Sequence, residues 1–300
     1  MKRLTDSFAE YLARAGVGIR RLPEHRELKL YSNSAGYQFL KDDNGIATDL
    51  PVTGALNPMM AFILLDTHFE SRDPSLEGMS LRQRYLTLPR TTKVDKMTAQ
   101  IYRLLRLYRI GLVQSDGTVE ESQGCIRSWC VANGTAFNLI ITKAGLALAE
   151  SFVSCYLNLL RLPFGEAYRE ALLSQYYADM VAEVKKFHDE DADLLRFYNR
   201  YQFNRHFRFD CGNPKFVVQG DQLVFDIADS YCNPLLYPID FYVTVDDALH
   251  IIPMEALKQN RLPMAGLPGW RQLVIDSNLA TAQQEIKFGH ESVSNGGPMS

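Results

Sequence analysis

The sequence predicts an α+β protein, because two kinds of pattern occupy different parts of the chain. Between 92 and 110, apolar residues recur at the spacing of one face of a helix. After residue 207, short runs of alternating apolar and polar residues flank turn-forming pairs such as Gly220-Asp221 and Asp246-Asp247. Helices and strands that are separated along the chain are typical of the α+β class.

The first 50 residues predict an N-terminal helix followed by a β-hairpin, as a unit over 1–50. Apolar residues between 4 and 15 share one helical stripe. Residues 27–31 and 37–40 have the composition of short strands, and the sequence Asp-Asp-Asn-Gly at 42–45 is typical of a turn.

The next region predicts three helices, at 57–69, 80–86 and 92–110. Thr92 is a suitable N-cap for the third helix, and Gly111 is a suitable C′ residue just after its end. The stripe that this helix is expected to turn toward the core consists of Met97, Ile101, Leu104, Leu105 and Tyr108.

The third helix lies in a strongly basic stretch of an acidic chain. Residues 81–112 contain eight basic residues and the single acid Asp95, a local charge of +7. The whole chain has 32 basic and 35 acidic residues, so the 24 basic and 34 acidic residues elsewhere net −10. A basic segment on an otherwise acidic protein is the electrostatic pattern of a surface that binds a polyanion, most often nucleic acid.

Long polar side chains on the far side of this helix have the reach to contact phosphates and base edges in a major groove. A merely solvated basic face is the alternative explanation. The predicted DNA-binding residues are Arg90, Lys93, Lys96, Gln100, Arg103 and Arg106, with Lys143 from the helix that follows.

The segment after the third helix predicts a strand, a turn, a second strand and a helix. Leu112 and Val113 begin the first strand, residues 137–141 form the returning one, and Thr142 is a suitable N-cap for the helix. This order resembles the recognition helix, wing and closing helix of winged-helix DNA-binding domains, most closely the MarR-type transcriptional regulators. The matching motifs are Gly111-Leu112-Val113 after the recognition helix and Ile141-Thr142-Lys143 with Gly145 after the wing.

The resemblance implies a winged-helix domain at 57–162 that binds duplex DNA with the helix at 92–110. The wing departs from the family pattern because it is much longer than a minimal hairpin and carries Glu120 and Glu121. Winged helices also bind proteins, as in the accessory subunits of bacterial condensin-like complexes. An interaction or architectural subunit of a chromosome-organising complex is therefore the alternative function.

The remaining region, 163–285, predicts a helical part and then a β-containing C-terminal domain. Residues 166–201 are expected to be helical. Two hairpins follow, one with strands at 216–218 and 223–225 and the other with strands at 241–245 and 249–252. The polar, glycine-rich tail at 286–300 is expected to be disordered.

A run of interleaved arginine and aromatic residues at 196–208 is a candidate second nucleic-acid contact. Such a composition suits stacking on bases and binding of backbone phosphates. In the alternative, the rings face a core and the arginines extend from it into solvent. The arginines are Arg196, Arg200, Arg205 and Arg208.

The sequence contains no phosphate-binding loop, nucleophile elbow or zinc-protease motif, so we expect no enzyme, no cofactor and no bound metal. A metal-dependent nuclease that uses scattered C-terminal carboxylates is a weaker alternative. Those carboxylates are Asp226, Asp229, Asp240, Asp246 and Asp247.

These patterns together predict a duplex DNA-binding protein of a bacterium, plasmid or phage, either a transcriptional regulator or a replication or partition factor. A homodimer is expected, with the C-terminal domain free to contact a protein partner. The longest apolar runs are too short to cross a bilayer, and Met1-Lys2-Arg3 is not followed by an apolar segment. The expected location is the cytoplasm.

Overall fold

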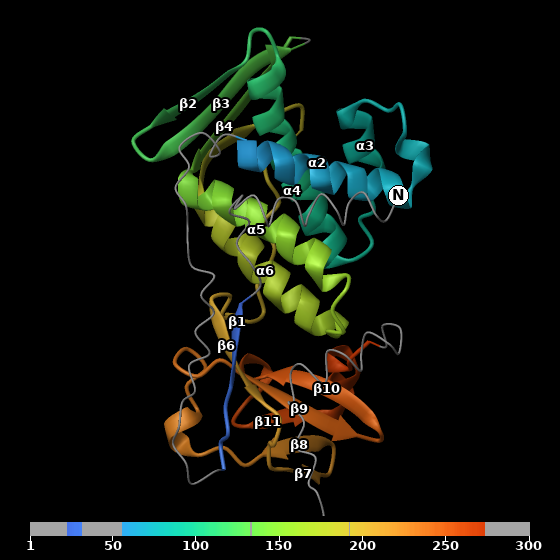
Figure 1. Ribbon diagram of the computed structural model, residues 1–300, viewed down its shortest axis with the longest axis vertical. Helices are drawn as coiled ribbons and strands as arrows, with labels where there is room; N and C mark the ends of the chain where they lie inside the picture. The colour runs from blue at the N-terminus through green and yellow to red at the C-terminus, as the bar shows by residue number, and fades with distance from the viewer. Residues whose placement is uncertain (1–22, 32–55, 133, 192, 274–300) are drawn as a thin grey trace, which may run out of the picture.

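The computed structural model describes residues 23–31, 56–132, 134–191 and 193–273, and it shows an α+β protein (Figure 1). The predicted N-terminal helix, the strand at 37–40, the turn at 42–45 and the tail at 286–300 lie outside the described residues. A helical part with one sheet occupies the upper half of Figure 1, and the other two sheets occupy the lower half.

The helices of the upper part include the three predicted ones, with small shifts at their ends. Their bounds are α2 (Leu56–Arg72), α3 (Leu81–Thr87), α4 (Lys93–Val113), α5 (Lys143–Leu159) and α6 (Glu166–Glu183), with a short 3-10 turn η1 (Pro74–Leu76) before α3. The helix predicted at 166–201 is shorter in the structure. It ends at Glu183, because the chain continues as a strand that pairs with the upper sheet.

The predicted N-caps are confirmed. The Thr92 hydroxyl accepts a hydrogen bond from the Asp95 amide at 3.0 Å, and the Asp95 carboxylate accepts one in return from the Thr92 amide at 2.9 Å. Thr142 caps α5 by accepting from the Gly145 amide at 3.0 Å. Each cap satisfies backbone N–H groups that have no partner inside the helix.

The predicted end of α4 at Gly111 is wrong, since the helix continues to Val113. Consequently Leu112 and Val113 are helical and do not begin a strand. A Cβ at Gly111 would overlap the hydroxyl of Ser128 and lie 3.1 Å from the carbonyl oxygen of Thr118. The glycine therefore permits the close approach of a strand to the helix and does not serve as a C-terminal cap.

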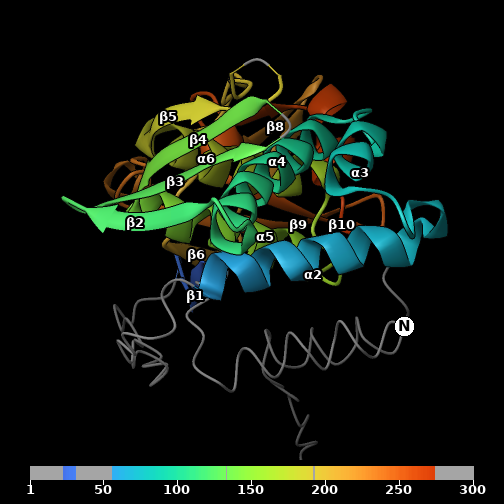
Figure 2. The same ribbon diagram turned by 90° about the horizontal axis from the view of Figure 1, so that it is seen from above.

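The upper sheet is antiparallel and has the strand order β2-β3-β4-β5. Its strands are β2 (Thr118–Ser122), β3 (Cys125–Ala132), β4 (Thr135–Thr142) and β5 (Val184–His188). The predicted strand at 137–141 is confirmed within β4. One face packs on α4, where the Ser128 hydroxyl donates to the Leu107 carbonyl at 3.1 Å. Seen from above, the four strands lie beside α4 (Figure 2).

The lower part contains a four-stranded sheet, β1-β6-β9-β10, and a three-stranded sheet, β11-β8-β7. Both predicted hairpins are confirmed, as β7-β8 and β9-β10. The strand predicted at 27–31 lies earlier, because residues 24–27 pair in parallel with β6. The bounds are β1 (Glu24–Glu27), β6 (Phe207–Cys211), β7 (Phe216–Gln219), β8 (Gln222–Phe225), β9 (Ile239–Val245), β10 (Ala248–Pro253) and β11 (Arg261–Pro263), with 3-10 turns η2 (Asp229–Tyr231), η3 (Met254–Ala256) and η4 (Met264–Trp270).

One continuous hydrophobic core joins the two parts, from Leu28 to Trp270. Near its middle, the ring of Tyr168 on α6 stacks on Phe164 with centroids 4.4 Å apart and meets Phe203 edge-on at 5.1 Å. Within the described residues, the helices are all too short or too polar to span a bilayer.

Candidate functional site

The predicted recognition helix, α4, is buried along most of its length. The predicted core stripe is confirmed, since none of its five side chains is more than 1% exposed. The stripe comprises Met97, Ile101, Leu104, Leu105 and Tyr108.

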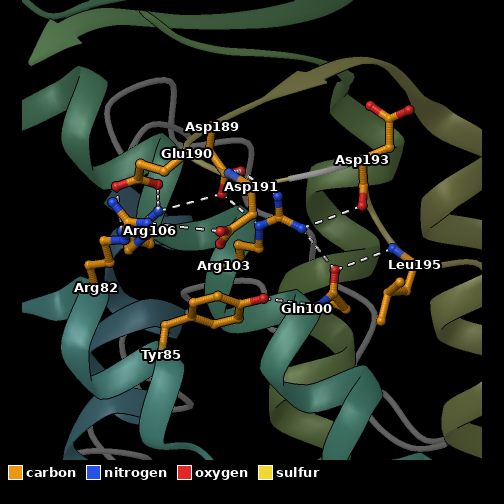
Figure 3. Close-up of polar contacts among 10 residues, drawn as sticks. All are labelled: Arg82, Tyr85, Gln100, Arg103, Arg106, Asp189, Glu190, Asp191, Asp193 and Leu195. Carbon is orange, nitrogen blue, oxygen red and sulfur yellow. Dashed lines mark hydrogen bonds and ion pairs between the residues drawn. The ribbon is translucent and has the colours of Figure 1, made fainter. Parts of the chain in front are cut away.

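The opposite side of α4 is buried as well. Gln100, Arg103 and Arg106 are each only 2% exposed. The expectation that these side chains face a DNA groove is therefore contradicted by the structure. The physical reason is that residues 189–191 and 193–198 of the same chain lie over this side of the helix, and Figure 3 shows the part from Asp189 to Leu195.

Arg103 forms a two-pronged ion pair with Asp189. Its Nε donates to Asp189 Oδ2 at 2.6 Å, and its Nη2 donates to Oδ1. The guanidinium also lies on the ring of Phe187, with Cζ 4.7 Å from the centroid. Because both ions are removed from water, the pair depends on this bidentate geometry to offset the cost of desolvation.

Arg106 and Gln100 extend the network on either side of this pair. Arg106 Nη1 donates to Glu190 Oε1 at 3.2 Å, and its Nη2 donates to Oε2 of the same carboxylate. Gln100 donates to the Tyr85 hydroxyl at 3.4 Å and accepts from the Leu195 amide at 3.3 Å. Apart from Arg106 Nε, which is buried without a hydrogen-bond partner, these side chains bind the protein's own groups (Figure 3).

The covering segment runs antiparallel to α4 and follows it toward its first turn. Its contacts, in order, are the Asp193 carbonyl with Arg103 at 3.4 Å, the Leu195 amide with Gln100 at 3.3 Å, and the Tyr198 carbonyl with Lys93 Nζ at 2.8 Å. The segment therefore covers the polar side of α4 at Arg103 and Gln100 and contacts it again at Lys93.

The pKa values indicate that the central pair stays charged. Burial raises the pKa of Asp189, but hydrogen bonds from Arg103 and the Asp191 amide, with the charges of Arg103 and Arg106, bring it below its ordinary value. Burial likewise lowers the pKa of Arg103, and Asp189 more than offsets this, so the pKa lies above its ordinary value.

The other predicted DNA-binding residues are more accessible. Arg90 and Lys96 are exposed near the first turn of α4. Lys93 is partly buried and lies 3.3 Å from the carboxylate of Glu170. Lys143 is exposed, and its ammonium group forms an ion pair with Glu121 in β2.

Most of the basic charge at 81–112 is neutralised within the chain. Five of the eight basic residues form ion pairs with acids from other segments, so the local charge of +7 is not a free surface charge. These pairs are Arg82 with Asp191, Arg84 with Asp66 and Glu70, Lys93 with Glu170, Arg103 with Asp189, and Arg106 with Glu190.

The aromatic and basic run at 196–208 divides into an exposed half and a structural half. Arg196 and Arg200 are exposed, and Tyr198 between them is 83% exposed. Arg205 donates from Nε to Asp179 at 2.6 Å. Arg208 is fully buried and is therefore not available for a nucleic-acid contact, contrary to the prediction.

The C-terminal aspartates do not form the nuclease site of the weaker alternative. Asp226, Asp229, Asp246 and Asp247 are exposed, and only Asp240 is buried. Asp246 and Asp247 have positive φ angles of 49° and 59°, so they form the turn of the β9-β10 hairpin.

Asp240 instead belongs to a cluster that the sequence analysis missed. Its partners there are His25 on β1 and Asp210 on β6. His25 Nδ1 lies 2.9 Å from Asp210 Oδ1 across 185 positions of the chain. Periodicity detects neighbours on one element, and it carries no signal for residues that only a parallel pairing brings together.

A scan of the chain against models of protein families gives no match, and comparisons with curated proteins and with solved structures also find no similar protein.

Proposed function

We propose that this chain is an architectural protein that assembles through the sheet of its winged-helix-like part, and that its first partner is a second copy of itself. The observation that carries the proposal is the exposed apolar centre of the outer sheet face, the side of β2-β5 that points away from α4. We define this outer sheet face by Glu120, Arg127, Trp129, Val131, Ile140 and Lys186.

The alternation of the strands separates this face from the core. In β3, Ser128 and Cys130 are buried, whereas Trp129 and Val131 are 39% and 44% exposed. Across the sheet, Trp129 pairs with Asn138 of β4. A partly exposed tryptophan beside Val131, with charged residues elsewhere on the same sheet face, is the composition expected of a protein interface and its rim.

The charges on the outer sheet face favour self-association. The cross-strand row runs from Glu120 on β2 through Arg127 and Ile140 to Lys186 on β5. If two copies pack face to face about a twofold axis along the strands, β2 of one copy covers β5 of the other. Glu120 then meets Lys186 of the second copy, and this ion pair forms twice by symmetry.

The order α2, α3, α4, sheet, α5 supports the winged-helix interpretation. The ion pairs between the basic stretch and acids from other segments favour protein binding over DNA binding. A winged helix that binds a protein partner is expected to differ from a DNA-binding one by having a recognition helix without a free basic face. Burial of Arg103 and Arg106 supports that alternative.

Sedimentation equilibrium tests the proposal directly. We expect the wild type to form dimers and Trp129→Ser to shift the equilibrium to monomers, because truncation of a central aromatic residue typically costs about 2 kcal/mol or more of binding energy. Tyr198→Ser is the matched control, since Tyr198 is a more exposed aromatic residue on another surface. A monomeric wild type at all accessible concentrations would contradict self-association.

A charge exchange tests the proposed orientation. Glu120→Lys and Lys186→Glu should each weaken the dimer by placing like charges together, and the double variant should recover it. Failure of the double variant to recover would exclude the twofold along the strands even if Trp129 proves essential.

A second candidate function is nucleic-acid binding at a smaller site, the basic corner, which comprises Arg90, Lys96, Arg196, Tyr198 and Arg200. The specific observation is the hydrogen bond from Lys93 Nζ to the Tyr198 carbonyl at 2.8 Å, which joins two basic segments about a hundred positions apart in the chain. The exposed ring of Tyr198 between two arginines suits stacking on an unpaired base.

Fluorescence anisotropy with single-stranded and duplex oligonucleotides tests this candidate. With two to four phosphates neutralised, log affinity for duplex should fall with log salt at a slope of about −2 to −4. Arg196→Ala with Arg200→Ala should weaken binding, whereas Lys186→Ala on the outer sheet face should not. Absence of binding at about 50 mM salt, the low end of the usual range, would refute the basic corner as a binding site.

A further inference from the structure

Three adjacent strands of the lower sheet place one imidazole and two carboxylates on the same face. Asp210 on β6 and Asp240 on β9 are direct partners in a parallel pairing, so their side chains lie next to each other. On the other side of β6, His25 of β1 pairs with Arg208. Arg208 and Asp210 are two positions apart on β6, so the side chains of His25, Arg208 and Asp210 lie on the same face of the sheet. We call His25, Asp210 and Asp240 the lower triad.

The ligand atoms of the lower triad are close enough to bind one ion. One nitrogen of His25 and one carboxylate oxygen from each aspartate all lie within 4.8 Å of one another. Carboxylates that face each other across two strands repel unless a positive charge lies between them or beside them. Arg208 already supplies one positive charge beside Asp240, and a cation bound by both carboxylates would offset the remaining negative charge.

Neighbouring side chains fix the orientation of both carboxylates. The Tyr242 hydroxyl donates to Asp210 Oδ1 at 3.0 Å, and the Tyr168 hydroxyl donates to Asp240 Oδ2 at 2.7 Å. Arg208 Nε lies 2.8 Å from each oxygen of Asp240, and its Nη groups each lie 2.8 Å from Glu255. Hydrogen bonds to ligating carboxylates are the usual second shell of a metal site.

Asp240 keeps the capacity to bind a cation. A carboxylate has about four lone-pair sites, and Asp240 receives three protons, two from Arg208 and one from Tyr168. The Nε proton of Arg208 is shared between both oxygens, so a cation would take the place of one half of this shared contact. The triad is also open to solvent on one side, because the side chains of His25 and Asp210 are 21% and 16% exposed while that of Asp240 is inaccessible. A cation therefore enters past His25 and Asp210.

We propose that the lower triad binds one first-row divalent cation, Mn²⁺ or Zn²⁺, and that the ion fastens strand β1 to β6 and β9. An imidazole with two carboxylates is a mixed nitrogen and oxygen donor set, which suits these ions better than the all-oxygen preference of Ca²⁺. The two carboxylate charges neutralise the charge of the ion. Binding of the ion replaces the contact between His25 and Asp210 with two ligand bonds.

Calorimetric titration of the metal-stripped full chain with MnCl₂ and with ZnCl₂ tests the site. We expect a stoichiometry of one that is lost in His25→Ala and in Asp210→Asn, two partly exposed positions whose variants should fold. Tyr242→Phe keeps all three ligands and removes one second-shell hydrogen bond, so the affinity should fall about tenfold or more. His188→Ala is the matched control, because it removes an exposed histidine from the other sheet.

Hydrogen exchange supplies a readout that does not depend on the heat of binding. Amides of β1 (Glu24–Glu27) should become slower to exchange when the metal is added to the wild type and should not respond in His25→Ala. Either of two results overturns the proposal: no metal bound by the wild type, or binding that His25→Ala and Asp210→Asn leave unchanged. A dimer lost through Trp129→Ser with metal binding intact would separate this site from the assembly function.

Discussion

Two buried arginine networks, one in each part of the molecule, differ in how their charges balance. In the upper network, Arg103 and Arg106 meet Asp189 and Glu190, so two cations serve two anions. In the lower network, Arg208 alone contacts both Asp240 and Glu255. In the upper network the charges are equal in number, and only Arg106 Nε is buried without a hydrogen-bond partner there. The lower network has one cation for two carboxylates and draws on the Tyr168 hydroxyl as well.

The largest expected effect is that of Arg208→Ala in the lower network. Loss of the guanidinium leaves two almost fully buried carboxylates without their cation, and breaking a buried pair in this way typically costs about 3 to 5 kcal/mol. Urea unfolding of the wild type and variant measures the loss. Arg205→Ala is the control, because its partner Asp179 is one-third exposed and such pairs contribute about 1 kcal/mol or less. Equal losses in the two variants would contradict the difference in burial.

Arg103→Ala should cost somewhat less, about 3 kcal/mol, at the lower end of the range for a broken buried pair. Asp189 would keep the Asp191 amide at 2.9 Å and Arg106 Nη2 at 3.5 Å. A double-mutant cycle with Asp189→Ala isolates the pair, and the double variant should be more stable than the sum of the single losses predicts. Additive losses would mean that the two side chains contribute independently.

Glu150 sharpens the comparison because it is a buried carboxylate that forms no ion pair among the residues that the structure describes. Burial raises its pKa to about 8. The folded state therefore holds a proton that the unfolded state releases, and stability falls as pH rises from about 4.5 to about 8. Glu150→Gln should remove this fall, so the variant should be more stable than the wild type at about pH 9. Parallel stability profiles of wild type and variant would contradict a buried, protonated Glu150.

The smallest effect is expected for Lys96→Ala, on the same helix as Arg103. Lys96 is exposed, and surface substitutions usually change stability by no more than about 0.5 kcal/mol. A thermal unfolding curve compared with that of Arg103→Ala measures the contrast. A loss as large as that of Arg103→Ala would mean that the first turn of α4 is also covered.

Sequence patterns predicted the helices and hairpins well because those depend on neighbours along the chain. The stripe of Leu104 and Leu105 and the caps at Thr92 and Thr142 are local features, and the structure confirms them. The end of α4 was misplaced because the space around Gly111 is set by Ser128, a residue of another element.

The site was predicted less well, for a related reason. Helical periodicity shows which side of α4 is apolar, but it does not show whether a distant segment covers the polar side. The acids at 189–193 have the charge complementary to Arg103 and Arg106, yet they lie more than 80 positions away. Likewise, residues 184–188 continue a helical composition in the sequence and become a strand only because β4 offers an edge to pair with.

The pairing of β1 with β6 has a consequence for the order of events during synthesis. The lower sheet can form only when β6 and β9 have been synthesised and pair beside β1. His25 on β1 is synthesised 185 residues before its partner Asp210 on β6. At a synthesis rate of about 5 to 20 residues per second, β6 is made about 10 to 40 s after β1. During this interval the helices of the upper part can form and pack, while the apolar residues next to β1 remain uncovered and open to chaperones.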